Sequence, residues 1–114
     1  MKRILLTLLL VAGTAGAQTT RDRLNDYPTE ARADYVFGCM AVNGQGRDVL
    51  GKCSCSIDVI AEILPYEDYL QAETVLSMQQ VGGERMAFFR SAAMPQAIVA
   101  ELRRAQAEAE IRCF

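Results

Sequence analysis

The spacing of four cysteines constrains this chain more than any other feature. Cys53 and Cys55 are separated by a single residue where an apolar helical run begins, while Cys39 lies upstream and Cys113 far downstream. Four cysteines in a small exported protein usually form two disulfides. A bond between Cys53 and Cys55 would span one residue, which the ordinary Cα separation of a disulfide disfavours. We therefore expect each of these two cysteines to bond one of the two distant ones.

Two pairings satisfy that condition, and both tie the first and last helices to a central one. A helical hairpin would bring Cys39 beside the start of the next helix, which favours Cys39–Cys53 together with Cys55–Cys113. A bond from the central helix to Cys113 closes a loop of nearly sixty residues. Such a bond is worth on the order of 4 kcal/mol.

The first 17 residues have the pattern of a signal peptide. A short basic stretch precedes an apolar run, and Ala15-Gly16-Ala17 is a small-residue cleavage site. The apolar run is shorter than the roughly 20 residues that span a bilayer. We expect cleavage after residue 17, export to the periplasm and no stable membrane insertion of the mature chain. Residues 18–27 are then a flexible N-terminal arm, and residues 28–114 a helical, disulfide-bonded domain.

The net charge of the mature chain indicates which partners it would attract. Lys2 and Arg3 fall in the signal peptide, which leaves ten basic residues against 14 acidic ones and a net charge of −4. Nucleic acids and anionic membranes attract basic surfaces. We therefore expect no nucleic-acid partner.

Apolar residues recur with helical periodicity, and no segment alternates as a strand would. Helices are predicted at 29–42, from 55 or 56 to 64, from 65 to about 80, at 84–93 and from 95 to 113, with a loop at 45–52. The inward faces are expected to hold the following residues: Tyr35, Val36, Cys39, Met40, Ile57, Ile60, Ala61, Leu64, Tyr69, Ala72, Val75, Leu76, Ile98, Leu102, Ala105 and Ala109. The predicted fold class is all-α, a single small domain of four to five helices stapled by two disulfides.

The chain contains no histidine, which removes several kinds of catalytic site. Haem attachment through CxxCH, nucleophile pairs with histidine and histidine-bearing zinc sites cannot be built. We therefore expect a non-enzymatic protein with no bound cofactor. One alternative is a thiol–disulfide redox protein centred on Cys53 and Cys55, because closely spaced cysteines at a helix N-terminus have low thiol pKa values.

Acidic residues flank the predicted turn at Pro65 on both sides. They are Asp58, Glu62, Glu67, Asp68 and Glu73. A turn there could gather their carboxylates into a site for a hard cation such as calcium or a lanthanide, although no EF-hand loop is present. A metal-binding chaperone is therefore a further alternative to the simpler interpretation, in which these residues are the solvated faces of two amphipathic helices.

The segment 81–90 combines two glycines with adjacent aromatic and basic residues. Phe88 and Phe89 are neighbours, and Arg85 and Arg90 flank them. Two adjacent aromatic residues cannot both face inward on one helix, so one is expected on an exposed patch for a protein partner. In the alternative interpretation, a short helix packs both rings into a thin core.

Four stretches of the sequence carry a resemblance to a known group of proteins. They are residues 35–40 (YVFGCM), 53–58 (CSCSID), 72–75 (AETV) and 109–114 (AEIRCF). With its C…CxC…C pattern, the chain resembles small exported helical proteins associated with quinoprotein (PQQ-dependent) alcohol oxidation in Gram-negative bacteria. The resemblance implies an accessory or chaperone role in the periplasm, in handling the calcium or lanthanide ion of such dehydrogenases, and it carries over no metal ligand.

A looser similarity, in layout alone, is to small disulfide-bonded helical immunity proteins that neutralise periplasmic toxins. The CxC pair departs from that group. The sequence therefore predicts a non-enzymatic periplasmic binding or accessory protein with a protein partner, and a toxin-neutralising protein is the last alternative.

Overall fold

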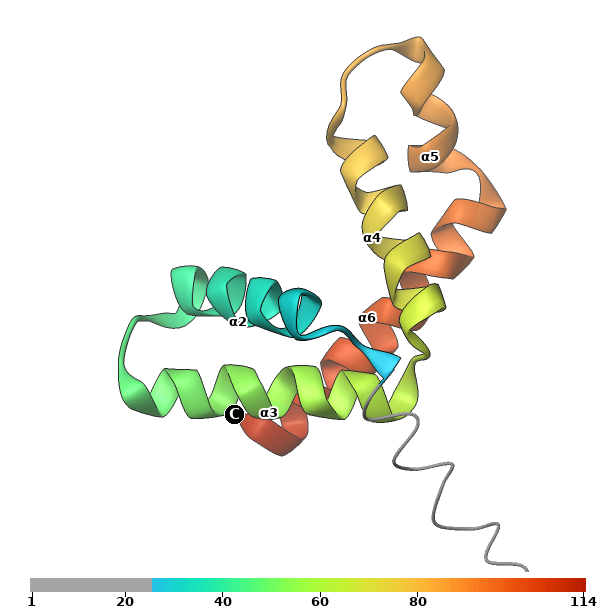
Figure 1. Cartoon of the computed structure of the whole chain (residues 1–114). Helices are drawn as coiled ribbons and strands as arrows, with labels where there is room; N and C mark the ends of the chain where they lie inside the picture. Colours follow the sequence, from blue (N-terminus) through green and yellow to red (C-terminus); the bar gives the residue numbers. More distant parts are fainter. Residues whose placement is uncertain (1–25) are drawn as a thin grey trace, which may run out of the picture.

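The computed structural model of the protein describes residues 26–114, and Figure 1 shows their arrangement. The signal peptide predicted at 1–17 and all but the last two residues of the predicted arm lie outside this range. The helices are α2 (Thr29–Asn43), α3 (Arg47–Ile63), α4 (Tyr66–Gln80), a 3₁₀ turn η1 (Glu84–Met86), α5 (Ala87–Ser91) and α6 (Ala93–Cys113). No strand occurs within residues 26–114, so the all-α prediction is confirmed.

Helix α3 begins well before the position that the sequence indicated. The loop predicted at 45–52 is limited to Gly44–Gly46, and the helix starts at Arg47 instead of residue 55 or 56. Gly44 ends α2 with a φ of +120°, which favours glycine, whereas Gly51 is accommodated inside α3. A glycine within a helix costs only about 1 kcal/mol, and Asp48 in the first turn suits the helix dipole. Cys53 and Cys55 consequently lie inside a helix and not at its N-terminus.

The two disulfides join the helices in the favoured pairing. Cys39 of α2 is bonded to Cys53 of α3, with Cα atoms 5.8 Å apart. Cys55 of α3 is bonded to Cys113 of α6, with a Cα separation of 5.7 Å. The central helix is therefore linked to both the first and the last described helices.

The residues just before α2 close the turn between α3 and α4. The Tyr27 side chain is 3% exposed, and its hydroxyl donates a hydrogen bond of 2.6 Å to the carbonyl oxygen of Leu64. The Asp26 carboxylate accepts a hydrogen bond of 2.8 Å from the first backbone N–H of α4, that of Tyr66. The arm was expected to extend to residue 27, but burial of this tyrosine makes it part of the core.

One hydrophobic core joins α3, α4 and α6. The inward faces predicted for these three helices are confirmed, whereas α2 contains no buried residue and its predicted stripe is only half-buried. Two of the three residues that α6 contributes to this core are alanines. The core cluster consists of Tyr27, Ile57, Val59, Ile60, Ala61, Leu64, Tyr69, Ala72, Leu102, Ala105 and Ala109.

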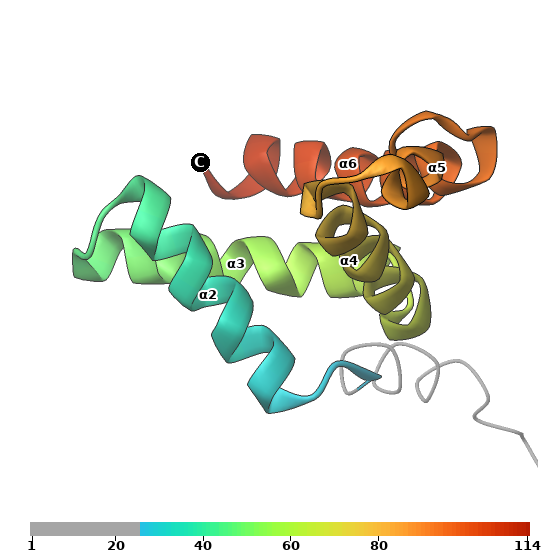
Figure 2. The same ribbon diagram turned by 90° about the horizontal axis from the view of Figure 1, so that it is seen from above.

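The helices form two arms that meet at an angle. Figure 1 shows α2 and α3 side by side in one arm, and α4, η1, α5 and the first half of α6 in the other. Figure 2, seen from above, shows the last half of α6 continuing along α3. Because α6 packs on both α3 and α4, it holds the arms together. The inner side of the angle lies between α2 and α4.

Candidate functional site

A groove lies in the angle between the two arms, and we call it the corner groove. Its volume is about 410 Å³. Its walls come from the start of α2 and from the first half of α4, which the turn at Pro65 and the buried Tyr27 bring together. The lining residues are Pro28, Glu30, Ala31, Asp34, Tyr66, Tyr69, Leu70 and Glu73.

Three carboxylates make the corner groove acidic. Glu30 and Asp34 lie one turn apart on α2, and Glu73 faces them from α4. None of the three forms an ion pair within residues 26–114. Burial raises the pKa of Glu73, the charge of Asp34 raises it further, and Arg103 opposes both effects. Asp34 and Glu73 therefore share one electrostatic environment although they come from different helices.

Two tyrosines form the aromatic wall of the corner groove. The Tyr66 and Tyr69 rings are stacked with their centroids 6.3 Å apart and an interplanar angle of 22°. Tyr69 also packs against Tyr27, with ring centroids 5.2 Å apart. Burial raises the pKa of the Tyr69 phenol, and the charges of Glu73 and Asp34 act in the same direction. At neutral pH this hydroxyl is therefore an uncharged hydrogen-bonding group.

The Tyr69 hydroxyl opens into the corner groove. The side chain is 7% exposed, and its hydroxyl has no hydrogen-bond partner among the described residues. In the same part of the chain, no side-chain nitrogen or oxygen that is fully buried lacks a partner. The unpaired hydroxyl is therefore not fully buried, and Tyr69 lines the corner groove.

The five residues predicted as a hard-metal site are distributed over separate surfaces. Asp58 pairs with Arg32 at 2.7 Å, and Glu62 pairs with Arg112 at 3.2 Å. Glu67 and Asp68 occupy the first turn of α4, and only Glu73 lines the corner groove. No three His, Cys, Asp or Glu side chains within residues 26–114 are grouped so that they could hold a metal ion. The turn at Pro65 therefore does not gather these carboxylates.

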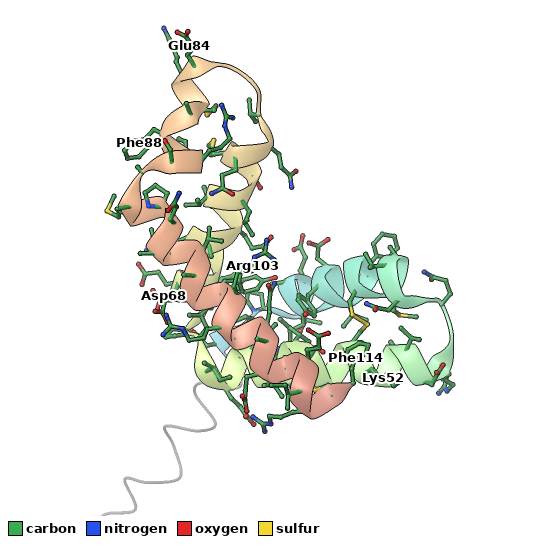
Figure 3. The ribbon with its side chains drawn as sticks, turned by 180° about the vertical axis from the view of Figure 1, so that it is seen from behind. Lys52, Asp68, Glu84, Phe88, Arg103 and Phe114 are labelled. Atoms are coloured by element: carbon green, nitrogen blue, oxygen red, sulfur yellow. A yellow bond between two sulfur atoms is a disulfide. The ribbon has the colours of Figure 1, made fainter. Side chains whose placement is uncertain are left out.

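A second pocket, of about 480 Å³, lies on another side of the same junction. Asp68 and Gln71 of α4 contribute to it together with Ile98 and Glu101 of α6. Figure 3 labels Asp68 close to the ribbon of α6. The two charged residues of this pocket are both acidic, but Glu101 is paired with Arg104 at 3.1 Å and most of the remaining lining is apolar.

The predicted partner-binding residues lie at the far end of the second arm. Phe88 is 53% exposed and Phe89 is half-buried, as expected if one ring faces outward, and the two rings meet edge to face at 5.5 Å. Figure 3 shows Phe88 and Glu84 near this tip. Arg90 donates hydrogen bonds to the carbonyl oxygens of Val81 at 3.2 Å and Gly83 at 3.3 Å.

Those bonds give Arg90 a structural role in closing the loop between α4 and α5. Arg85 remains exposed. The tip is thus a folded loop with one outward aromatic ring.

Both cysteines of the pair predicted as a redox alternative, Cys53 and Cys55, are disulfide-bonded. Both disulfides are closed, and Cys53 is fully buried. Cys55 and Cys113 are half-buried between α3 and α6. Because the pair lies inside α3, the helix N-terminus that would lower a thiol pKa is absent from this site.

The corner groove was not predicted from the sequence. The i, i+4 spacing of Glu30 and Asp34 and the i, i+3 spacing of Tyr66 and Tyr69 were visible, and each places a pair on one helix face. The contact between the two faces depends on the turn at Pro65 and on the position of Tyr27, which no periodicity reveals.

The chain matches no known family model, and no curated protein or solved structure shows significant similarity to it. No helix within residues 26–114 has the length and apolar character needed to cross a membrane.

Proposed function

We propose that this protein is a non-enzymatic binding or accessory protein that is exported to the periplasm and recognises a protein partner. The corner groove is the observation that carries this proposal. It combines three carboxylates, a neutral phenol and stacked rings, which are groups for recognition. A chain without histidine and with every cysteine bonded offers no conventional nucleophile–base pair.

Two features support the proposed location. Disulfides persist in oxidising compartments and are rare in the cytosol, and this small domain contains two that link three of its helices. The N-terminal 17 residues have the composition of a signal peptide. The resemblance to proteins associated with PQQ-dependent alcohol oxidation would make the partner a quinoprotein dehydrogenase.

The other interpretations stay predictions with direct tests. A metal-binding chaperone would show saturable heat in calorimetric titrations with calcium or a lanthanide. A thiol–disulfide protein would reduce insulin faster than a variant carrying both Cys53→Ser and Cys55→Ser. A toxin-neutralising protein would capture a toxin from a periplasmic extract.

The proposed function is tested by affinity capture from the periplasmic extract of the native organism. The bait is the oxidised mature protein, fixed to its partner with a cleavable cross-linker. We expect one protein to be retained in near-stoichiometric amount and to be lost when the bait is reduced and unfolded. Capture of no protein above the level of an unrelated helical, disulfide-bonded bait would contradict the proposal.

A further inference from the structure

We propose that the corner groove binds an arginine or lysine side chain, presented by an extended basic segment of the partner protein. This inference rests on the proposed function, because it names the chemistry of the partner at the same site. It follows from the charge, the unpaired hydroxyl and the aromatic wall of the groove.

The negative charge of the corner groove is not balanced from within the described residues. The Arg32 guanidinium lies beside the Asp58 carboxylate at 2.7 Å and over the Tyr27 ring at 5.5 Å. Neither of these partners lines the corner groove. Arg103 contacts Gln106, and its effect on Glu73 is smaller than the opposing effect of Asp34. A cation that enters between Asp34 and Glu73 would therefore relieve a repulsion that the folded chain maintains.

The Tyr69 hydroxyl is an independent indication of a ligand. More than nine-tenths of this side chain is buried, yet its hydroxyl opens into the groove without a partner in the described part of the chain. No fully buried side-chain oxygen in residues 26–114 lacks a partner, so this unpaired hydroxyl is accessible and a ligand in the groove can reach it. A hydroxyl near two carboxylates can accept a hydrogen bond from the same donor group that they attract, which an ammonium or guanidinium provides.

The remaining features favour an organic cation over a metal ion. Calcium requires six to eight oxygen ligands at about 2.3–2.6 Å, and no three acidic side chains in residues 26–114 are close enough together to supply them. The half-buried ring of Tyr66, which lines the groove, suits a guanidinium or ammonium, because aromatic rings attract such cations. A volume of about 410 Å³ accommodates a long side chain.

A peptide segment fits the groove better than a free amine does. Leu70 lies at the rim and is half exposed, so it offers an apolar contact to residues that flank the cation. A free amine would leave this contact unused.

The test is a titration of the ¹⁵N-labelled mature, oxidised protein with the peptide acetyl-Gly-Arg-Gly-Arg-Gly-amide, followed by NMR. We expect saturable shift changes at the amides of Asp34, Tyr69 and Leu70. The double variant Asp34→Asn/Glu73→Gln should bind about tenfold or more weakly, because two charge-assisted hydrogen bonds are removed. Tyr69→Phe should weaken binding about threefold to tenfold. The NMR spectrum of each variant reports whether it is folded.

A matched variant distinguishes peptide binding in the corner groove from a general effect of the protein's total charge. Glu84→Gln/Glu108→Gln removes two exposed carboxylates that line none of the described pockets, and its affinity should equal that of the wild type. The proposal is overturned by an absence of shifts at about 5 mM peptide, or by equal binding of the corresponding Gly-Glu peptide. Groove shifts with calcium chloride alone, at lower concentration than with the arginine peptide, would also overturn it.

The same variants distinguish this inference from the proposed function. If the wild type and Asp34→Asn/Glu73→Gln capture the same partner equally well, the accessory function stands and the groove is not its recognition site. If no bait captures a partner while the peptide still binds in the groove, the cation site stands and the accessory function fails.

Discussion

Tyr27 connects three parts of the chain at the inner corner of the molecule. Its hydroxyl bonds the carbonyl oxygen at the end of α3, and its ring contacts Tyr66 and Tyr69 at the start of α4, both at 5.2 Å between centroids. Leu64 and Pro65 form the turn that this contact closes. Together with the packing of α6, this side chain holds the direction in which α4 leaves α3, and with it the wall of the corner groove.

Tyr27→Phe should lower the free energy of unfolding by about 1–3 kcal/mol at pH 7, because it leaves the buried carbonyl of Leu64 without its donor. Urea denaturation measures this change. The matched control is Tyr66→Phe, whose hydroxyl has no hydrogen bond in the described structure, and its effect should stay within about 0.5 kcal/mol. Equal losses in both variants would contradict the assigned role.

The stabilities of the wild type and of Tyr27→Phe should depend differently on alkaline pH. Burial raises the pKa of the Tyr27 phenol above its ordinary value near 10. As the pH rises above 10, the unfolded chain releases this proton while the folded chain retains it, so the wild type loses stability. Tyr27→Phe lacks this loss, and the stability difference between the two proteins should therefore shrink above pH 10.

Glu73 provides a direct probe of the charge in the corner groove. Asp34→Asn removes the neighbouring charge that raises the Glu73 pKa, so that pKa should fall toward its ordinary value. A ¹³C NMR titration of the side-chain carboxyl measures it. Asp48→Asn, at the start of α3, is the control and should leave the Glu73 pKa unchanged.

The raised pKa of Glu73 means that the fold loses stability as the pH rises through that pKa and the carboxyl ionises. Glu73→Gln should therefore not reduce the free energy of unfolding at pH 7.

At the scale of the element, α2 differs from the other long helices. It has 15 residues and none of them is buried, whereas α3 and α6 each bury a continuous face. Its attachments are the Cys39–Cys53 bond, the Arg32–Asp58 ion pair and the half-buried side chains Tyr35 and Val36. A partly exposed ion pair contributes little, so we expect the disulfide to be the main attachment.

Removing the two disulfides separately should therefore have different local effects. In Cys39→Ala/Cys53→Ala, we expect the amides of α2 to lose protection from hydrogen exchange while those of α3 and α6 keep it. In Cys55→Ala/Cys113→Ala, α2 should remain protected. The loops close over 14 and 58 residues, so the global losses should be about 3 and about 4 kcal/mol. Protection of α2 that survives the first change would show that packing alone holds it.

The whole molecule depends on α6 more than on any other described helix. Its first half lies along α4 and α5 and its last half along α3, where Cys113 bonds it. The core runs without interruption through this crossing. We therefore expect both arms to unfold together.

Leu102→Ala removes a fully buried side chain at this crossing. It should lower the free energy of unfolding by about 2–5 kcal/mol, and far-ultraviolet circular dichroism and tyrosine fluorescence should report one common transition. Ile111→Ala, on the same helix but 80% exposed, is the control and should change it by about 0.5 kcal/mol at most. Two separate transitions would indicate that the arms are independent.

Much of the fold could be predicted from short-range rules. Helical periodicity identified the buried faces of α3, α4 and α6, because a period of 3.6 residues places Ile57, Ile60 and Leu64 on one side whatever they pack against. Disulfide geometry disfavoured the Cys53–Cys55 bond, and the expectation of a helical hairpin favoured the pairing that the structure contains.

The sequence by itself therefore determined the helical class, the core faces and which cysteines could bond, since each follows from distances of a few residues. Only the structure showed that α3 begins at Arg47, because Gly51 opposes helix by only about 1 kcal/mol and Asp48 suits the helix dipole. It also decided that Asp34 and Glu73 share a groove while Asp58 and Glu62 pair elsewhere. Those contacts depend on the angle between the two arms. Long-range packing around Tyr27 and α6 sets this angle, and no local sequence pattern encodes it.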